Sequence, residues 1–365
     1  MHQLRTLLDH YNEPLLGIHA KHYLKNVQIL EEDGVVQIHL RIGFFLSDTQ
    51  IDQLISKLSD YLYDKGIEQA FEIDVASKVE THKVQSGLKP IKGIKNIIAI
   101  ASGKGGVGKS TTCANLAIAL ANNGAKVGIL DADIYGPSQP LIMGSYDNPT
   151  TDDKKKIKPL VRHGVKVISV GNLIDPDSAI IWRGPMVSGA LMQLLNDTDW
   201  GELDYLFIDL PPGTGDIQLT MAKKIPMSAS IIVTTPQDLS LIDAKRAIAM
   251  FNKVQIHTLG IIENMSVYTC QNCGETAHIF GEKAAEKLVE KYDTSLLGSL
   301  PLAIEIREDA DSGKPTMAKT QKNALSQLYN EIALQVSAKI ASLPKAVMIN
   351  MPTVKVEYTN NSSKN

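Results

Sequence analysis

Residues 103–110 read Gly-Lys-Gly-Gly-Val-Gly-Lys-Ser, which places glycines, a lysine and a hydroxyl at the spacing of a phosphate-binding loop. Glycines let a backbone wrap closely around phosphate oxygens, and the N–H groups at the start of the next helix add partial positive charge. Lys109 is predicted to reach the terminal phosphates of a nucleotide, and the Ser110 hydroxyl to ligate Mg²⁺. An apolar stretch before the loop and a helical stretch after it argue against a bare glycine-rich turn. The expected nucleotide contacts are Gly103, Lys104, Gly105, Gly106, Val107, Gly108, Lys109, Ser110 and Thr111.

Acidic residues stand where two apolar strand-like runs end. VGILDAD ends with Asp131 and Asp133, and YLFIDLPP contains Asp209. Ligands of open α/β folds bind at the carboxyl edge of the sheet, so we expect all three carboxylates there. Asp209 is predicted to hold Mg²⁺ through water, with Asp131 and Ser110 at the same ion. Asp133 is the candidate to orient or deprotonate the attacking water, because phosphoryl transfer needs positioning more than covalent help. Helix capping or turn formation is the structural alternative for each aspartate.

Cys270 and Cys273 form a CxxC pair, a spacing that allows both thiolates to face one metal centre. Two thiolates make only half of a tetrahedral site. A symmetric dimer would bring four to its two-fold axis, enough for a [4Fe–4S] cluster or a zinc ion. A redox dithiol and a zinc site that includes His278 remain alternatives. Cys113 has apolar neighbours on a predicted helix and is interpreted as a small buried side chain.

The composition excludes several classes of protein. The 365 residues are more than one core of typical size needs, so we expect two domains. The 37 Lys and Arg are balanced by 40 Asp and Glu, which gives no reason to expect a nucleic-acid partner. No apolar run reaches the roughly 18 residues that span a membrane, and the first residues do not resemble a signal peptide. Three cysteines cannot build a disulfide framework. We therefore expect a cytoplasmic protein without a membrane partner.

A small α/β domain is predicted over residues 1–80. Residues 3–10 have helical spacing, and residues 23–42 read as two strands joined at Asp33-Gly34. Ser47 and Asp48 are placed to cap a helix, and FEIDVA alternates like a strand. The polar and basic residues 81–95 are interpreted as a linker.

A parallel-sheet domain is predicted over residues 96–345. Short apolar runs without polar alternation repeat between helical stretches, which is typical of a sheet covered by helices on both faces. With the phosphate loop at the end of its first strand, this is the pattern of a P-loop NTPase. Residues 346–365 are interpreted as a flexible tail.

The loop KGGVGKST resembles the deviant Walker A loop of an ATPase group that includes the Min and Par partitioning proteins, the arsenite pump ATPase and the nitrogenase iron protein. Within that group the chain resembles the Mrp/ApbC iron–sulfur cluster carriers over roughly residues 95–345. The similar blocks occur in the same order; they are DADIYGPSQP, WRGPMVSGALMQLL, IDLPPGTGDIQLT, TTPQDLSLIDAKRAIAMF and GIIENMS followed by CQNCG.

This resemblance implies a homodimeric ATPase that binds ATP, Mg²⁺ and a bridging [4Fe–4S] cluster, and that hands the cluster to apo iron–sulfur proteins together with assembly factors. Lys104 would reach across the dimer interface to the partner's nucleotide, making it a catalytic candidate beside Lys109, Asp133 and Asp209. Asn264 and Pro301 would lie near the adenine. Asp133 and the loop 211–216 would be the switch elements. The family usually has Cys-Pro-x-Cys, where this chain has Gln271 in place of the proline.

The first 80 residues resemble a small domain often fused ahead of bacterial Mrp proteins. That domain often carries an Asp-Pro-Glu turn and a cysteine, whereas this chain has only NEPLL at residues 12–16 and no cysteine before Cys113. Docking, rather than metal binding, is the expected role. The rival hypotheses are a partitioning ATPase that dimerises on a membrane or DNA, a pump-associated ATPase that binds a metalloid, and a zinc-containing regulatory ATPase. A partitioning ATPase should carry a basic amphipathic C-terminus, and MPTVKVEYTNNSSKN offers little of either property.

Overall fold

The computed structural model describes residues 2–13, 16, 18–151, 156–172, 184–282, 284–292, 294–321 and 323–346. The predicted tail beyond Ala346, Trp182 and Arg183 of the WRGPM block, and Pro14 and Leu15 of NEPLL lie outside these residues. Among the described residues, no helix is both long and apolar enough to cross a bilayer.

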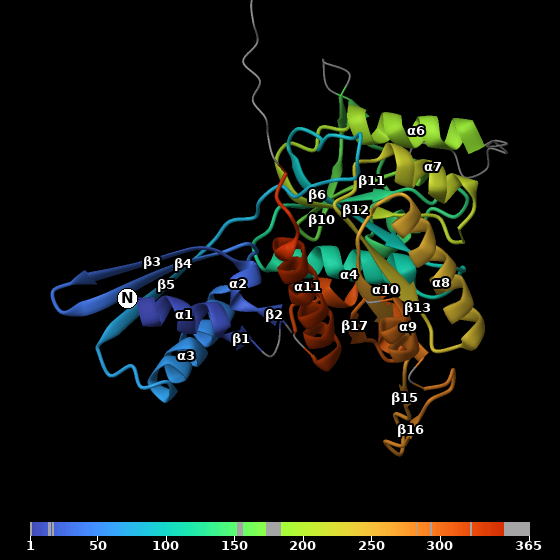
Figure 1. Ribbon diagram of the computed structural model, residues 1–365. Coiled ribbons are helices and arrows are strands. Elements are labelled where there is room, and N and C mark those ends of the chain that lie inside the picture. The colour runs from blue at the N-terminus through green and yellow to red at the C-terminus, as the bar shows by residue number, and fades with distance from the viewer. Residues whose placement is uncertain are drawn as a thin grey trace, which may run out of the picture.

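The larger unit is built on an eight-stranded sheet (Figure 1). The strand order is β10-β11-β7-β12-β6-β13-β14-β17, and every neighbouring pair is parallel except β10 with β11. The strands are β6 (Ile94–Ala101), β7 (Val127–Asp131), β10 (Leu160–Arg162), β11 (Val165–Ser169), β12 (Leu203–Asp209), β13 (Ala229–Thr234), β14 (Thr258–Glu263) and β17 (Leu296–Ser299). The predicted parallel-sheet α/β fold is confirmed.

Helices cover both faces of this sheet because its strands are apolar on both sides. In β6, Ile98 and Ile100 face one core while Ile97 and Ala99 face the other. The first core packs against α4 (Lys109–Asn122), α5 (Gln139–Ile142), α10 (Ile304–Asp311) and α11 (Ala324–Ser342), and it contains the fully buried Cys113. The second packs against α6 (Gly184–Asp197), α7 (Asp216–Lys224), α8 (Asp238–Lys253) and α9 (Ala284–Tyr292).

The N-terminal unit is a three-stranded sheet, in the order β3-β4-β5, with helices on one face. Its elements are α1 (His2–His10), β1 (Asn12–Glu13), β2 (Ile18–His19), α2 (Ala20–Tyr23), β3 (Leu24–Glu32), β4 (Val35–Ile42), α3 (Asp48–Asp64) and β5 (Phe71–Ser77). Asp33 and Gly34 form the predicted turn with φ of 51° and 78°. The backbone N–H of Ser47 donates to Gln50 Oε1 at 2.8 Å, which closes the start of α3 as the sequence predicts.

The two units share side chains. Leu334, Ala338 and Ala341 of α11 belong to the apolar core of the N-terminal unit. The segment 81–95, interpreted from its composition as a linker, contains a fully buried His82 whose Nδ1 lies 2.9 Å from Asn96 Oδ1 of β6. The connection is therefore packed against the sheet domain at this point.

Gln85 in the same segment is buried and bound at three points to the end of α7. Its Nε2 donates to the carbonyl oxygens of Ala222 and Ile225, each at 2.7 Å, and its Oε1 accepts from the N–H of Met227 at 2.9 Å. One side chain thus satisfies the backbone groups left open where the helix ends.

Candidate functional site

The phosphate loop lies between β6 and α4. Gly106 and Gly108 have φ of 77° and 81°, the left-handed region that glycine enters without strain. A Cβ on Gly108 would also collide with Asn264 Nδ2. The loop and the first turn of α4 therefore form an open backbone cradle at a helix N-terminus, the arrangement predicted for phosphate.

Lys109 is buried beneath this loop and forms an ion pair with Asp209. Its Nζ also lies 3.2 Å from the Ser110 hydroxyl oxygen. Burial by itself lowers the pKa of Lys109, but the charge of Asp209 and the hydrogen bond to it outweigh that effect, so the pKa is raised. The lysine stays charged while its carboxylate partner neutralises it.

Asp131 and Asp209 are register partners at the ends of β7 and β12, and both are fully buried. Burial, followed by the charge of Asp209, raises the pKa of Asp131 to about 7. Asp131 accepts hydrogen bonds from the N–H groups of Asp133 and Gln139, at 3.1 and 3.0 Å, and from the Ser169 hydroxyl at 2.9 Å. These bonds favour a role in shaping the loop after β7, while its part in binding Mg²⁺ stays a prediction.

Asp133 lies at a cavity of about 640 Å³. The same cavity is lined by Pro211, Pro212 and Asp216 from the loop expected to act as a switch. Burial raises the pKa of Asp133, and Lys109 opposes this rise. The two predicted switch elements therefore meet at one cavity.

Lys104 turns toward its own chain. Its Nζ donates to Gln237 Oε1 at 2.7 Å, at the residue before α8 begins. This bond holds the half-buried lysine beside the loop. Its reach across a dimer interface stays a prediction.

A second cavity, of about 400 Å³, lies against the phosphate loop. Gly106, Gly108 and Thr111 line it together with Asn264 and Pro301, the two residues expected near the adenine. Asn264 Nδ2 donates to the carbonyl of Val107 at 2.9 Å, so this side chain also braces the loop. The structure therefore brings the predicted base-side residues and part of the phosphate loop around one space.

The CxxC pair lies in a small hairpin, β15 (Tyr268–Thr269) and β16 (Thr276–Ala277), that projects from the sheet domain (Figure 1). Cys270 is half-buried and Cys273 is exposed. Hydrogen bonds from the backbone N–H groups of Cys273 and Asn272, then the contact with the Cys273 side chain, lower the pKa of Cys270. The turn therefore favours the thiolate that metal binding requires.

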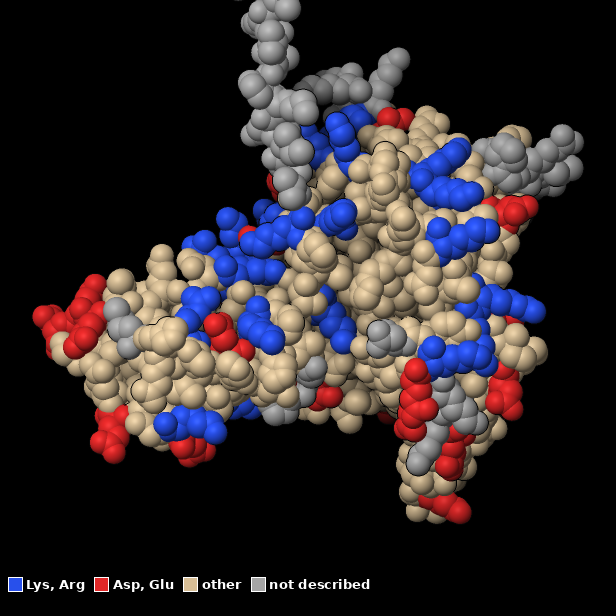
Figure 2. Space-filling view, in the orientation of Figure 1, with Lys and Arg blue, Asp and Glu red and all other residues tan. Residues whose placement is uncertain are grey.

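The hairpin segment itself carries acidic side chains. Residues 264–282 contain Glu275 and Glu282 but no Lys or Arg, and Figure 2 shows acidic side chains at this projection. His278, the alternative zinc ligand, has Nδ1 2.9 Å from the carbonyl of Ser266 and Nε2 3.5 Å from Glu282. Within the described part of the chain, no three His, Cys, Asp or Glu side chains are grouped to hold a metal ion. The described residues of one chain thus supply two thiolates and no completed site.

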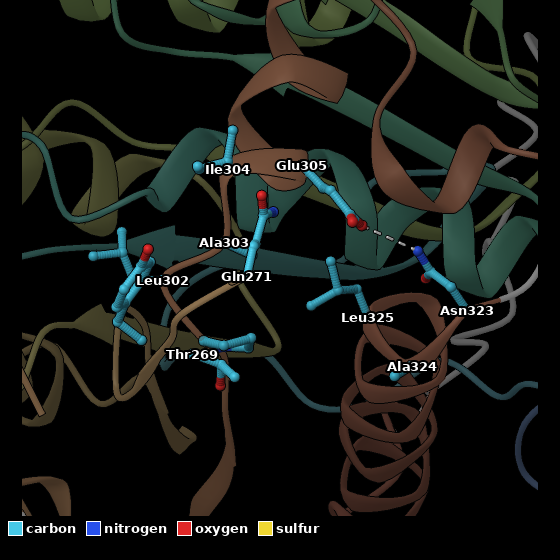
Figure 3. Close-up of a pocket in the computed structure, with 11 residues that line it drawn as sticks. Thr269, Gln271, Leu302, Ala303, Ile304, Glu305, Asn323, Ala324 and Leu325 are labelled. Atoms are coloured by element: carbon cyan, nitrogen blue, oxygen red, sulfur yellow. Dashed lines mark hydrogen bonds between the residues drawn. The ribbon is translucent and has the colours of Figure 1, made fainter. Parts of the chain in front are cut away.

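A third cavity, of about 360 Å³, lies between the hairpin and the start of α11 (Figure 3). Gln271 of the CxxC sequence lines it together with Leu302, Ala303 and Leu325. We call the second cavity, which is lined by Asn264, the base-side cavity. It shares three lining residues with the third cavity, Pro301, Leu302 and Ala303, so one short segment separates the two cavities.

Sequence reasoning missed Gln139, although it lies in the block DADIYGPSQP. Its side chain is fully buried at the ends of β7 and β12, and Nε2 donates to Asp209 Oδ2 at 2.8 Å and to the Ser110 carbonyl at 3.0 Å. A glutamine next to a proline reads as a turn residue. The only signal in the sequence is its position six residues after Asp133, in a block already assigned to the site.

Comparison with known proteins agrees with these features. The family model described as ParA, NUBPL iron-transfer P-loop NTPase, matches residues 93–337. The iron–sulfur cluster carrier protein of Escherichia coli K12 is 46% identical over 338 residues, covering 91% of this chain and 90% of the relative. The protein of the same name from Pseudomonas fragi is 52% identical over 271 residues, covering 74% of this chain and 94% of the relative.

Solved structures share the fold. A nucleotide-binding protein from Archaeoglobus fulgidus, in complex with ADP, matches with a TM-score of 0.55 and 37% identity over 64% of this chain and 94% of that one. The cell division ATPase MinD of Pyrococcus furiosus matches with a TM-score of 0.50 and 24% identity, covering 66% of this chain and 98% of that one. The second likeness concerns the fold alone.

Proposed function

Because the chain belongs to the family of NUBPL iron-transfer P-loop NTPases, we propose that it is an ATP-binding and ATP-hydrolysing carrier of iron–sulfur clusters. In this proposal two chains hold one labile [4Fe–4S] cluster between them. The cluster is the cargo, which passes to apo-proteins and to assembly factors. Family membership itself is as the Mrp/ApbC resemblance predicts.

The phosphate loop supports the nucleotide half of the proposal. Its glycine backbone and Lys109 would hold the phosphates, and the relative from Archaeoglobus fulgidus is a complex with ADP. The Ser110 hydroxyl and the Asp209 carboxylate are hard oxygen donors, which fit Mg²⁺. Bound Mg²⁺ would neutralise charge on the phosphates. Lys109 must then exchange Asp209 for phosphate, while Asp133 orients the attacking water.

The incomplete thiolate site supports the cluster-binding part of the proposal. The chain supplies Cys270 and Cys273 on an exposed hairpin, and no third ligand is grouped with them among the described residues. A tetrahedral or cluster site needs four ligands, and a two-fold axis through the hairpin region would double the two available. An exposed, two-chain site would release its cargo when the dimer rearranges.

A continuous backbone connection supports control of cluster transfer by nucleotide. Asn264 at the base-side cavity and Cys270 are six residues apart in the same segment. This segment is tied to the strand end that follows β17, because Ser266 N donates to the Leu300 carbonyl at 3.0 Å and Leu302 N to the Val267 carbonyl at 2.8 Å. A shift of the base-side wall on nucleotide binding would therefore move the base of the hairpin.

Anaerobic reconstitution with iron and sulfide tests this function. We expect about four irons per dimer, with the absorption of a [4Fe–4S] centre, and transfer of that centre to an apo-protein acceptor. A stable stoichiometric zinc ion with no uptake of iron would contradict the proposal and favour the zinc-containing regulatory ATPase. ATP turnover measured on the same sample reports on the nucleotide half independently.

A further inference from the structure

Gln139 joins three parts of the nucleotide site through one buried residue. Its Nε2 donates to Asp209 Oδ2 at the end of β12 and to the carbonyl of Ser110 at the start of α4. Its backbone N–H donates to Asp131 Oδ2 at the end of β7, at 3.0 Å. Gln139 thus links the Ser110 backbone at the start of α4 to both strand-end carboxylates, Asp131 and Asp209.

The two oxygens of Asp209 have different partners. Lys109 holds Oδ1, and Gln139 holds Oδ2. A lysine that moves to phosphate releases Oδ1, whereas nothing in that movement requires Gln139 to leave Oδ2. The amide would then keep the carboxylate oriented while its other oxygen becomes free to accept a new hydrogen bond.

The amide oxygen of Gln139 has no hydrogen-bond partner among the described residues, although it is buried. Buried carbonyl oxygens almost always receive a hydrogen bond from protein or from ordered water. A donor is therefore missing beside Asp209 and Ser110, the residues that fit Mg²⁺. Water bound to the ion would supply that donor.

We propose that Gln139 is a positioning residue for Mg²⁺: Nε2 orients Asp209, and Oε1 accepts a hydrogen bond from ion-bound water. The inference rests on the proposed binding of a Mg²⁺–nucleotide. The alternative is a structural brace that holds α4 to the strand ends and has no part in binding the ion.

The substitution Gln139→Met separates the two roles, because methionine keeps the volume and removes both polar atoms. The affinity for a fluorescent ADP is measured with Mg²⁺ and with EDTA, on the full chain. We expect the affinity in EDTA to change by less than about threefold. The strengthening by Mg²⁺ should fall roughly tenfold or more, as expected for a lost hydrogen bond to a charged group.

The Mg²⁺ ratio is the ADP affinity with Mg²⁺ divided by the ADP affinity in EDTA. If Gln139→Met weakened ADP binding equally under both conditions, its Mg²⁺ ratio would equal that of the parent. That result would overturn the proposal in favour of the structural brace. Gln85→Met is the matched control, since Gln85 is also buried but binds only backbone groups at the end of α7. It should lower the melting temperature and leave the Mg²⁺ ratio unchanged. If the ADP affinity of the parent protein did not depend on Mg²⁺, the result would instead contradict the Mg²⁺–nucleotide binding in the proposed function.

Gln139→Leu supplies a second variant if the methionine variant folds poorly, because leucine also removes both polar atoms in a side chain of similar volume. We expect the same loss of the strengthening by Mg²⁺, roughly tenfold or more. A strengthening by Mg²⁺ equal to that of the parent would contradict the positioning role.

Discussion

Lys109 and Asp209 form a buried ion pair beneath the phosphate loop, 100 residues apart in the sequence. The lysine that must reach phosphate is thus held by the carboxylate expected at Mg²⁺. Neither charge can be removed without leaving the other uncompensated in a buried site. The pair couples the stability of the fold to the occupancy of the nucleotide site.

The first prediction concerns this pair. Lys109→Ala should abolish ATP hydrolysis and lower the free energy of unfolding by about 3 kcal/mol, because Asp209 is left as an unpaired buried charge. Denaturant unfolding and a phosphate-release assay measure the two effects. Adding Asp209→Asn to Lys109→Ala should restore part of the stability and none of the hydrolysis. Normal turnover in the single variant would refute the assignment of the phosphate loop.

The second prediction tests the role of Lys104 in a dimer. Lys104→Ala and Asp133→Ala should each be inactive, and a mixture of the two should regain hydrolysis through heterodimers with one intact composite site. This prediction rests on two positions: Lys104 lies beside the phosphate loop, and Asp133 lies at the cavity that it shares with the loop 211–216. Each unmixed variant at the same total concentration is the control. Full activity of Lys104→Ala alone would show that this lysine has only a structural role, as a hydrogen-bond donor to Gln237.

The third prediction concerns pH. Burial raises the pKa of Asp131 from 3.8 to about 7, so the folded chain retains a proton between these values that the unfolded chain has lost. Stability from this group is therefore greatest below about pH 4 and falls as the pH rises to about 7. Asp131→Asn should flatten this part of the pH dependence of unfolding. An unaltered slope in Asp131→Asn would show that other groups cause this part of the pH dependence.

The fourth prediction separates the cluster ligands from the buried thiol. Cys270→Ala or Cys273→Ala should lose nearly all iron after reconstitution while ADP affinity stays within about threefold, because the hairpin is a separate element from the loop. Cys113→Ala should keep the iron, since its side chain is buried in the core beneath α4. Iron retained by both hairpin variants would exclude the hairpin as the cluster site.

Local patterns in the sequence predicted the elements that carry the candidate site. The glycine spacing of the loop, the apolar strand before it and the aspartates after β7 and β12 are all properties of short segments, and a parallel sheet brings strand ends to one edge whatever the loops do. The turn at Asp33-Gly34 and the cap at Ser47 are local for the same reason. The family resemblance that predicts Asn264 and Pro301 near the base also rests on short sequence blocks.

Long-range contacts required the tertiary structure. Asn264 binds the carbonyl of Val107, 157 residues away, and Gln85 binds the carbonyl of Ala222 in α7, 137 residues away. A polar residue in a polar segment gives no local sign that it is buried, so the composition of residues 81–95, interpreted as a linker, did not indicate that His82 and Gln85 are buried.

The register of the sheet determines the electrostatic environment of Asp131 and Asp209. The sequence by itself determined that Asp131 and Asp209 end two strands, because each follows its own apolar run. Only the strand order and register made them direct partners, raised one pKa and set Lys109 and Gln139 on the two oxygens of Asp209. Those properties depend on distances between separate segments in a buried site, and no single segment encodes such a distance.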